Sequence, residues 1–349
     1  MTSRNTNWKN KPFVLSPAGK DYLWGGNRLN TDFHKNIDMS PLAETWECST
    51  HPDGVSIVAS GEHQGKSLDT VLAEHPEYLG SHPAAVMNAL NPEGRKDVNS
   101  HLTLPVLVKL IDAEQNLSVQ VHPDDTFAAI HENGSPGKTE MWYVLDAAPG
   151  AHLVYGFNRD MDDELLRRSL EQGTIEKYLQ KSPVQKDDVF YIEAGTVHAI
   201  GAGVLLAEVQ ENSNLTYRLY DYERVDRHGS KRPLHIEKAM QVLNYKSSEN
   251  PRQPIRVLRY QPGCASEFLC RCKYFQVERL LINTLSTHVA PQYATAEQSF
   301  QILLCVDGRG EIIMSRKKLP FEKGSCIFVP ANSVPLQLTG RAQLLKISC

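Results

Sequence analysis

The sequence predicts a mostly β protein made of two jelly-roll barrels with a few helices. Most apolar runs are short and end at Gly, Pro or Asp, as the strands of barrels and sandwiches do. Helical periodicity is confined to a few segments. A stretch in the first part of the chain, DDVFYIEAGTVH (187–198), is echoed by GSCIFVPANSVP (324–335), which indicates a second copy of the same strand–turn unit.

The expected strands are short stretches rich in β-branched, aromatic and aliphatic residues, separated by turn residues. Examples lie at residues 117–122, 141–146, 151–157, 188–195, 204–210, 215–222, 275–282, 300–308 and 326–331.

Three segments carry apolar residues at helical spacing. Residues 67–79 open with Ser67 in a capping position, and residues 161–179 place acidic residues in their first turn. Gly173 is expected to break the second of these helices into two pieces. Residues 234–243 form the third candidate helix.

We expect three regions along the chain. Residues 1–12 are polar and form a flexible leader, and residues 13–250 form the first barrel with a helical insertion. Residues 255–349 form the second, smaller barrel. The boundary is expected near residues 245–260, where the stretch KSSENPRQP (246–254) is polar and contains proline.

The second barrel is expected to bind no metal. Pro335 takes the place that His198 holds in the first copy of the echo, and His288 is the only histidine after residue 255. A single histidine without a paired carboxylate would bind a catalytic ion poorly. Four apolar residues of this barrel are expected to be buried in alternation: Ile302, Leu304, Ile327 and Val329.

The composition excludes several classes of partner. The formal net charge is −4 and no Lys/Arg-rich run stands out, so neither nucleic acid nor an anionic membrane is an expected partner. Seven cysteines without a CxxC pair argue against a disulfide framework and a Cys-rich zinc site.

The polar N-terminus has no secretory h-region, and no apolar run approaches the roughly 20 residues of a membrane helix. We therefore expect a cytoplasmic protein.

Four side chains from separate segments are candidate metal ligands. In SVQVHPDD (118–125), Gln120 and His122 share one strand face because side chains alternate along a strand. Glu140 begins the next strand, and His198 follows the turn EAGT. Two histidines and a carboxylate suit Zn²⁺ and also Fe²⁺, Mn²⁺ or Co²⁺, while Gln120 could add a neutral oxygen.

A second group of charged residues lies near these ligand segments. Glu208 and Arg218 fall inside apolar strands, where a charge is costly to bury unless it is paired or used. Two interpretations stay open: a structural Glu208–Arg218 ion pair, or a clamp for a phosphate or an enediolate. Lys109 and Lys138 are further cations beside the ligand segments.

Six ordered motifs cover most of residues 13–245. They are WGG (24–26), ETWECSTHPDG (44–54), LPVLVKLIDAEQNLSVQVHPDD (104–125), GKTEMWYVL (137–145), AGTVHAIGAG (194–203) and EVQENSNLTYRLYDYERVDRHGSKRPLH (208–235). In type and order they resemble type I mannose-6-phosphate isomerases of the cupin superfamily. The variant SNLTYRLYDY resembles the short bacterial branch, which lacks an inserted helical domain.

The resemblance implies a cupin-type enzyme of carbohydrate metabolism with one zinc ion per chain. It implies the interconversion of mannose 6-phosphate and fructose 6-phosphate. By motif match, the zinc ligands fall on Gln120, His122, Glu140 and His198, the active-site arginine on Arg218, and the substrate-lining residues on Lys109, Ser118, Lys138, Glu208 and Arg224. Gly137 stands where some relatives carry a histidine proposed as an acid–base group, and Asn214 stands where others carry Asp.

The expected chemistry moves a proton between C1 and C2 of the open-chain sugar through an enediol. Arg218 is expected to stabilise the enediolate or the phosphate, and Lys138 and Glu208 are both candidates for proton transfer. Two other functions stay open. A cupin enzyme of the dioxygenase type would need the metal ligands but not the cations around them. A non-catalytic sugar-phosphate-binding paralogue would be expected to have lost a ligand or Arg218, and the sequence retains them all.

Overall fold

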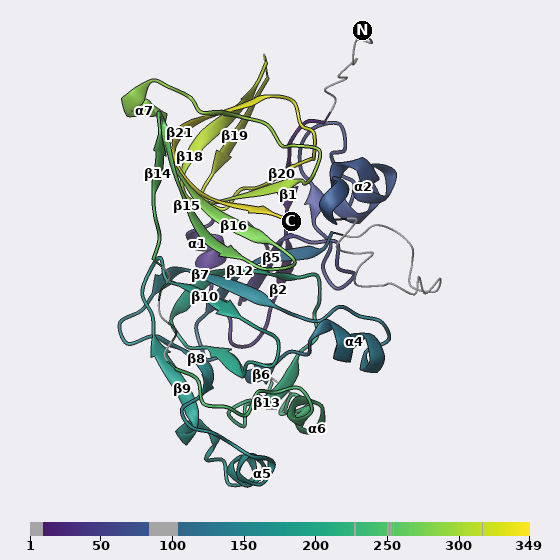
Figure 1. Cartoon of the computed structure of the whole chain (residues 1–349), viewed down its shortest axis with the longest axis vertical. Coiled ribbons are helices and arrows are strands. Elements are labelled where there is room, and N and C mark those ends of the chain that lie inside the picture. The colour runs from purple at the N-terminus through teal and green to yellow at the C-terminus, as the bar shows by residue number, and fades with distance from the viewer. Residues whose placement is uncertain are drawn as a thin grey trace. The chain divides into compact units, whose positions relative to one another are not determined.

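The computed structural model describes residues 10–83 and 104–349, except for residues 227, 250, 252, 254 and 316. Most of the expected leader, residues 1–12, therefore lies outside the described residues. Strands predominate over short helices, as the sequence predicts (Figure 1). None of the helices in the described part of the chain is long and apolar enough to span a membrane.

The chain divides into two compact units, each assembled from separate stretches of sequence. Unit 1 comprises Met1–Ala18, Trp46–Leu107 and Ile255–Cys349, and unit 2 comprises Gly19–Thr45 and Val108–Pro254. This differs from the linear division expected at residues 250–255. The physical reason is strand pairing, because β1 (Phe13–Ser16) lies antiparallel to β20 (Cys326–Val329), near the other end of the chain.

Unit 2 is built around two sheets. The six-stranded sheet has the order β10 (Val189–Ile192), β7 (Glu140–Ala147), β12 (Val204–Glu211), β5 (Val106–Ala113), β3 (Glu44–Cys48) and β2 (Ala18–Lys20). The five-stranded sheet has the order β13 (Tyr217–Tyr220), β6 (Val119–Val121), β11 (His198–Ile200), β8 (His152–Phe157) and β9 (Leu179–Pro183). Trp142 and Leu206 of the first sheet pack with Leu153 and Ile200 of the second in one buried apolar cluster, as in a double-sheet jelly roll.

The structure contains helices in all three expected segments, and others besides. The described helices are α1 (Arg28–Thr31), α2 (Leu68–Glu74), α4 (Asp125–His131), α5 (Asp163–Glu171), α6 (Ile236–Met240) and α7 (Thr284–Thr287), with the 3-10 turns η1 (Pro76–Tyr78) and η2 (Ile175–Lys177). Gly173 separates α5 from η2 and has a φ of +63°, a conformation that glycine adopts without strain. The predicted break in this helical segment is therefore confirmed.

Alternation along two strands of the five-stranded sheet positions the candidate site. Val119 and Val121 of β6 and Leu219 of β13 join an apolar cluster that also takes in residues of α5 and α6. Since successive side chains of a strand point to opposite faces, Gln120 and Arg218 point the other way. They face the side on which the two sheets of unit 2 pack together.

Unit 1 is built around a single ten-stranded sheet that curves around its own apolar core (Figure 1). The order is β14 (Arg259–Gln261), β15 (Cys264–Arg271), β16 (Gln276–Asn283), β21 (Leu336–Ser348), β18 (Gln301–Met314), β20, β1 and β4 (Ile57–Val58), with β17 (Gln292–Tyr293) beside β21 and β19 (Lys317–Glu322) beside β18. The fold class expected from the sequence, mostly β with cupin-type barrels, is confirmed.

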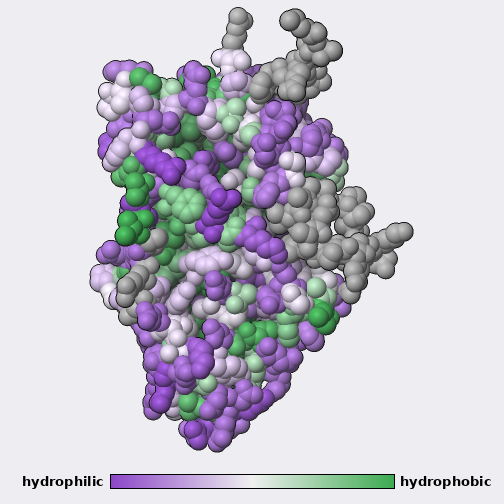
Figure 2. Space-filling view, in the orientation of Figure 1, coloured by the Kyte–Doolittle hydropathy of each residue, from purple (hydrophilic) through white to green (hydrophobic). Residues whose placement is uncertain are grey.

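Strand β14, at the edge of the unit 1 sheet, is exposed along all of its residues. Figure 2 shows hydrophobic side chains gathered on the surface beside this strand. The exposed apolar residues of this stretch include Ile255, Val257 and Tyr260. Elsewhere the face in view is mostly hydrophilic (Figure 2).

Candidate active site

Three of the four expected metal ligands converge inside unit 2. His122 follows directly on β6, Glu140 is the first residue of β7, and His198 is the first residue of β11. Their ligand atoms lie within 4.8 Å of one another, and all three side chains are buried. The histidines come from the five-stranded sheet and the carboxylate from the six-stranded sheet, so the cluster lies where the two sheets meet.

Local contacts orient His198 toward this cluster. Its Nδ1 lies 2.8 Å from the carbonyl oxygen of Thr196 and donates a hydrogen bond to it, because a carbonyl can only accept. The lone pair is therefore on Nε2, the nitrogen that faces Glu140 at 3.8 Å. Gln120 is the strand neighbour of His198, and its amide lies 3.3 Å from His198 Nε2. A histidine fixed in this way through its second nitrogen is typical of metal sites.

Burial sets the protonation state of the three ligands. Burial lowers the pKa of His122 to about 3, with a further contribution from the Lys138 ammonium. Burial also lowers the pKa of His198. Burial alone would raise the pKa of Glu140, but Lys138 and the two imidazoles together hold it well below its ordinary value. The cluster thus presents two neutral imidazoles and one carboxylate at neutral pH, the form in which these groups bind metals.

The residues of the cluster fit a divalent metal ion. Glu140 Oε2 and His122 Nδ1 are buried without a hydrogen-bond partner among the described residues. A buried carboxylate without full compensation is costly, and a metal ion would supply that compensation. Two imidazoles and one carboxylate form a common ligand set of catalytic zinc and other divalent ions.

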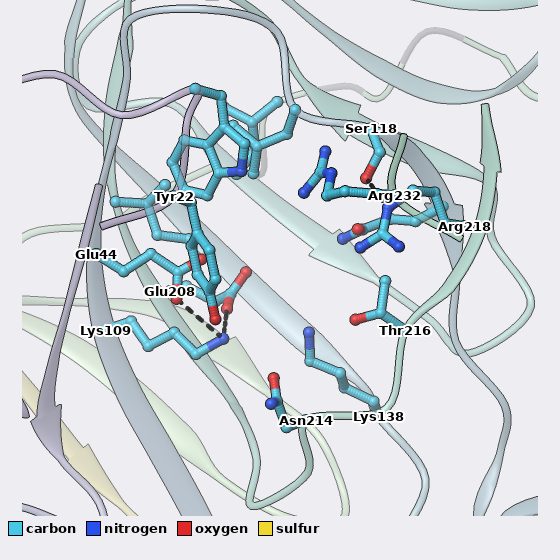
Figure 3. A pocket seen from close by; sticks show the side chains of 15 residues that line it. Tyr22, Glu44, Lys109, Ser118, Lys138, Glu208, Asn214, Thr216, Arg218 and Arg232 are labelled. Atoms are coloured by element: carbon cyan, nitrogen blue, oxygen red, sulfur yellow. Dashed lines mark hydrogen bonds and ion pairs between the residues drawn. The ribbon is translucent and has the colours of Figure 1, made fainter. Parts of the chain in front are cut away.

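A pocket of about 290 Å³ opens beside this cluster, within unit 2 (Figure 3). Its lining is rich in polar and charged side chains. It consists of Tyr22, Trp24, Glu44, Lys109, Ile111, Leu117, Ser118, Gln120, Lys138, Ile200, Glu208, Asn214, Thr216, Arg218 and Arg232. In Figure 3, Arg218 and Arg232 lie on one side of the pocket, and Glu44, Lys109 and Glu208 lie on the other.

Glu208 is held by two donors on the inner wall. Its Oε1 accepts a hydrogen bond from Lys109 Nζ at 2.9 Å, and its Oε2 accepts one from Trp142 Nε1 at 2.8 Å. Glu44 lies 4.0 Å from the same Lys109 ammonium. Burial would lower the pKa of Lys109, but Glu208 and Glu44 raise it above its ordinary value. Lys109 therefore stays protonated, and the ion partner of Glu208 is Lys109 rather than Arg218.

Arg218 reaches the pocket from β13 with its guanidinium held by two other contacts. Its Nε donates to Ser118 Oγ at 3.2 Å, and its Nη1 donates to the carbonyl oxygen of Pro233 at 2.9 Å. Burial lowers the pKa of Arg218, and the neighbouring Arg232 lowers it further. Of the two interpretations left open by the sequence, the structural pair with Glu208 is not found among the described contacts of Arg218.

Lys138 stands at the entrance to β7, directly beside the metal ligands. Its Nζ lies 2.5 Å from Glu140 Oε1 and 3.3 Å from His122 Nε2. The preceding Gly137 packs so tightly that a Cβ there would lie 2.5 Å from backbone atoms of both Asp124 and Asp125. A side chain at position 137 would therefore clash with the backbone of this chain.

The structure brings nearly all sequence-predicted site residues together. Arg224 is the exception, because it does not line the pocket. Its guanidinium contacts the Asp221 carboxylate, and its Nη1 donates to the carbonyl oxygen of Asn116 at 2.5 Å. Five further residues line the pocket although the sequence did not identify them as site residues: Tyr22, Trp24, Glu44, Thr216 and Arg232. A signal was present for Glu44, which lies in the motif ETWEC, a run whose five residues are all buried.

The fold and the site together define a metal-dependent enzyme of the cupin type whose pocket is equipped for a small anionic substrate. The family model of the type I phosphomannose isomerase catalytic domain matches residues 13–141, and that of the mannose-6-phosphate isomerase cupin domain matches residues 265–349. The chain belongs to the type I mannose-6-phosphate isomerase family.

Similar proteins support this assignment over the whole chain. Mannose-6-phosphate isomerase ManA of Bacillus subtilis is 33% identical over 96% of this chain and 98% of its own length. The mannose-6-phosphate isomerase of Streptococcus mutans is 34% identical over 96% of this chain and 97% of its own. The crystal structure of the Bacillus subtilis mannose 6-phosphate isomerase superposes with a TM-score of 0.83 at 31% identity, covering 98% of this chain and 100% of the other.

Proposed function

We propose that the protein interconverts mannose 6-phosphate and fructose 6-phosphate, an aldose–ketose isomerisation. The observation that carries this proposal is the buried His122–Glu140–His198 cluster beside a pocket that presents Lys138 and Arg218. Relatives that match almost the full chain carry the name of this activity.

The pocket suits a phosphorylated sugar. Its volume of about 290 Å³ is at the small end of the range for ligand sites. Two arginines on one side offer planar donors to a phosphate, and the polar side chains of Asn214 and Thr216 can bond sugar hydroxyls. A dioxygenase-type enzyme needs a set of metal ligands of this kind but does not need two arginines beside them.

The reaction requires that a proton leave C2 of the open-chain aldose and return at C1. A base must be held within reach of that proton, and the hydrogen bonds from Lys109 and Trp142 fix the Glu208 carboxylate on the lining of the pocket. Lys138 is the second candidate for this role, from its position beside the metal ligands. We propose that one of these two residues, Glu208 or Lys138, transfers the proton.

Negative charge develops on the sugar oxygens as the proton leaves. Arg218 is the strand neighbour of Gln120, which places it next to the ligand cluster. Its contacts with Ser118 and Pro233 hold the guanidinium in place, so no reorganisation is needed when the charge appears. We propose Arg218 as the group that stabilises the enediolate.

The metal is proposed to be one zinc ion per chain, held by His122, Glu140 and His198 with Gln120 as a weaker fourth ligand. When bound, the ion would act as a Lewis acid toward the sugar oxygens. The neutral state of both imidazoles and the charged state of Glu140 support this assignment.

The test combines a coupled assay of mannose 6-phosphate conversion with elemental analysis. We expect stoichiometric zinc in the purified protein, loss of at least about 100-fold in activity on chelation, and recovery on adding zinc back. Metal without isomerase activity would favour the dioxygenase-type alternative. Sugar-phosphate binding without turnover would favour a non-catalytic paralogue, and either result would overturn the proposal.

A further inference from the structure

A second arginine, which lies outside the residues assigned to catalysis, reaches the same pocket. Arg232 lines the pocket, and 23% of its side chain is exposed. Its Nε donates to Asp221 Oδ2 at 2.8 Å and its Nη2 to Asp221 Oδ1 at 2.5 Å. Two parallel hydrogen bonds of this kind fix the plane of a guanidinium.

Asp221 remains charged in its buried position. Burial would raise its pKa, but hydrogen bonds from Arg232 and Arg224 hold the pKa below its ordinary value. Asp221 is therefore a rigid carboxylate that orients Arg232, and only 7% of its side chain is exposed. Because Asp221 binds the Nε and Nη2 edge of the guanidinium, the opposite edge of Arg232 faces away from Asp221.

The free edge of Arg232 is available for a ligand. The pair with Asp221 engages Nε and Nη2, and no described residue accepts a hydrogen bond from Nη1. Arg218 holds Pro233, the residue next to Arg232, through the Pro233 carbonyl oxygen. The two arginines are thus fixed relative to each other by short contacts within one wall of the pocket (Figure 3).

The excess positive charge on the arginine side of the pocket favours the binding of a dianion. Arg218, Arg224 and Arg232 lie close enough to influence one another, and Asp221 balances only one of the three. Arginines that repel each other are stabilised when an anion binds between or beside them. Lys109, by contrast, already has two carboxylate partners on the opposite wall.

We infer that Arg232, oriented by Asp221, is the phosphate ligand of this pocket. The inference rests on the proposed function for the identity of the sugar, but the phosphate chemistry follows from the arginine pair itself. Arg232 anchors the non-reacting end of the substrate, and Arg218 acts at the reacting end. Asp221 is a positioning residue, since it acts through Arg232.

The experiment compares the metal-loaded wild-type protein with Arg232→Gln, Arg232→Lys and Asp221→Asn. The control is Arg167→Gln, which removes an arginine with an equally bidentate carboxylate partner, Glu237, outside this pocket. Binding of inorganic phosphate is measured by calorimetry, and KM and kcat are measured with mannose 6-phosphate. Thermal melts and metal content verify that each variant is folded.

We expect Arg232→Gln to weaken phosphate binding and to raise KM by about ten- to 100-fold, with kcat within about twofold of wild type, because a charged hydrogen-bonding pair is lost. Arg232→Lys should recover part of the affinity, Asp221→Asn should lose part of it, and Arg167→Gln should behave like wild type. If a folded Arg232→Gln variant binds phosphate as the wild type does, or loses kcat at unchanged KM, the inference is wrong.

The two proposals fail in different ways. A wild-type protein that binds phosphate through Arg232 but does not isomerise the sugar would overturn the proposed function and support the inference. An active enzyme whose phosphate affinity does not depend on Arg232 would overturn the inference and leave the function in place.

Discussion

Arg218 shows how much of the site depends on one side chain with a fixed orientation. Its guanidinium is tied to Ser118 and Pro233, and its strand neighbour Gln120 faces the ligand cluster. Lysine would keep the positive charge but would lose the planar fork that makes both contacts. Substituting lysine at position 218 therefore tests whether catalysis depends on the positive charge alone or also on the planar geometry of the guanidinium.

We predict that Arg218→Lys lowers kcat by about 100- to 1,000-fold with little change in KM, as expected for a group that acts mainly in the transition state. Steady-state kinetics with mannose 6-phosphate checks this, with Arg167→Lys as the matched control. A higher KM at unchanged kcat would assign Arg218 to ground-state phosphate binding instead. A folded variant with normal kinetics but a lower melting temperature would show that Arg218 is structural.

At the scale of residues, the sequence predicted the metal site better than the pocket. His122, Glu140 and His198 were identifiable only in combination, because two histidines and a carboxylate from separate strands form a common set of metal ligands. Arg232 was not, because it lies in an irregular segment after β13, where no periodicity shows which way a side chain points. Its role depends on the contact with Asp221, which only the folded chain reveals.

An irregular segment that carries Lys138 connects helix α4 to strand β7 beside the site. Thr139 N donates to Glu211 Oε1 at 2.8 Å, and Gly137 N donates to Asp125 Oδ1 at 3.1 Å. Burial and the neighbouring Asp125 carboxylate raise the pKa of Glu211 to about 9. A protonated Glu211 thus helps to hold the segment that carries Lys138.

This raised pKa predicts a specific pH dependence of stability. Between an unfolded pKa near 4.5 and a folded pKa near 9, the folded state keeps a proton that the unfolded state releases. The free energy of unfolding should therefore fall as pH rises through this window, by at most about 1.4 kcal/mol per pH unit from this group.

Glu211→Gln removes this titration while keeping an amide that can bond to Asp125 and Thr139. We expect the melting temperature of the variant, relative to wild type, to rise steadily from pH 5 to pH 9. Thermal melts at several pH values provide the measurement, and Glu164→Gln, an exposed acid on α5, is the control. Parallel pH profiles for wild type and Glu211→Gln would contradict a protonated Glu211.

The nine strands named from the sequence all occur in the structure, whereas β5, β15, β21 and the helix α4 were not identified. The only fully buried residue of α4 is Ala128, so it has no apolar stripe, and its start depends on Asp124, whose side chain accepts a hydrogen bond from Phe127 N. In the second barrel, the four residues expected to be buried are buried, namely Ile302, Leu304, Ile327 and Val329, but they do not alternate with exposed residues. Leu303 and Phe328 are as buried as their neighbours, because Phe328 stacks on Phe13 and Phe300 on the other face of the sheet.

The organisation of the whole molecule departs from the order of the sequence. The echo between 187–198 and 324–335 correctly indicated two β units. It gave no sign that β1 and β4 join the unit formed mostly by the C-terminal residues, because strand pairing between distant segments leaves no local pattern. The expected boundary near residue 250 divides the chain into consecutive parts, whereas each compact unit combines separate stretches of the sequence.

We predict that a chain truncated after residue 254 loses most of its soluble yield. The truncation removes β20, so Phe13 and Leu15 of β1, which are 2% and 4% exposed in the full chain, lose their partners. Size-exclusion chromatography and metal analysis of the truncated and full chains provide the test. A monodisperse, metal-loaded and fully active fragment would show that residues 255–349 contribute nothing to the enzyme.

The pairing of β1 with β20 also has a consequence for synthesis. More than 300 residues separate these strands, so at about 5–20 residues per second roughly 15–60 s pass between their emergence from the ribosome. Every stretch of unit 2 has been translated by residue 254, whereas unit 1 stays incomplete until the last strands appear. The nascent chain must therefore shield its earliest apolar strand for most of its own translation, which makes that strand a natural point of contact for chaperones.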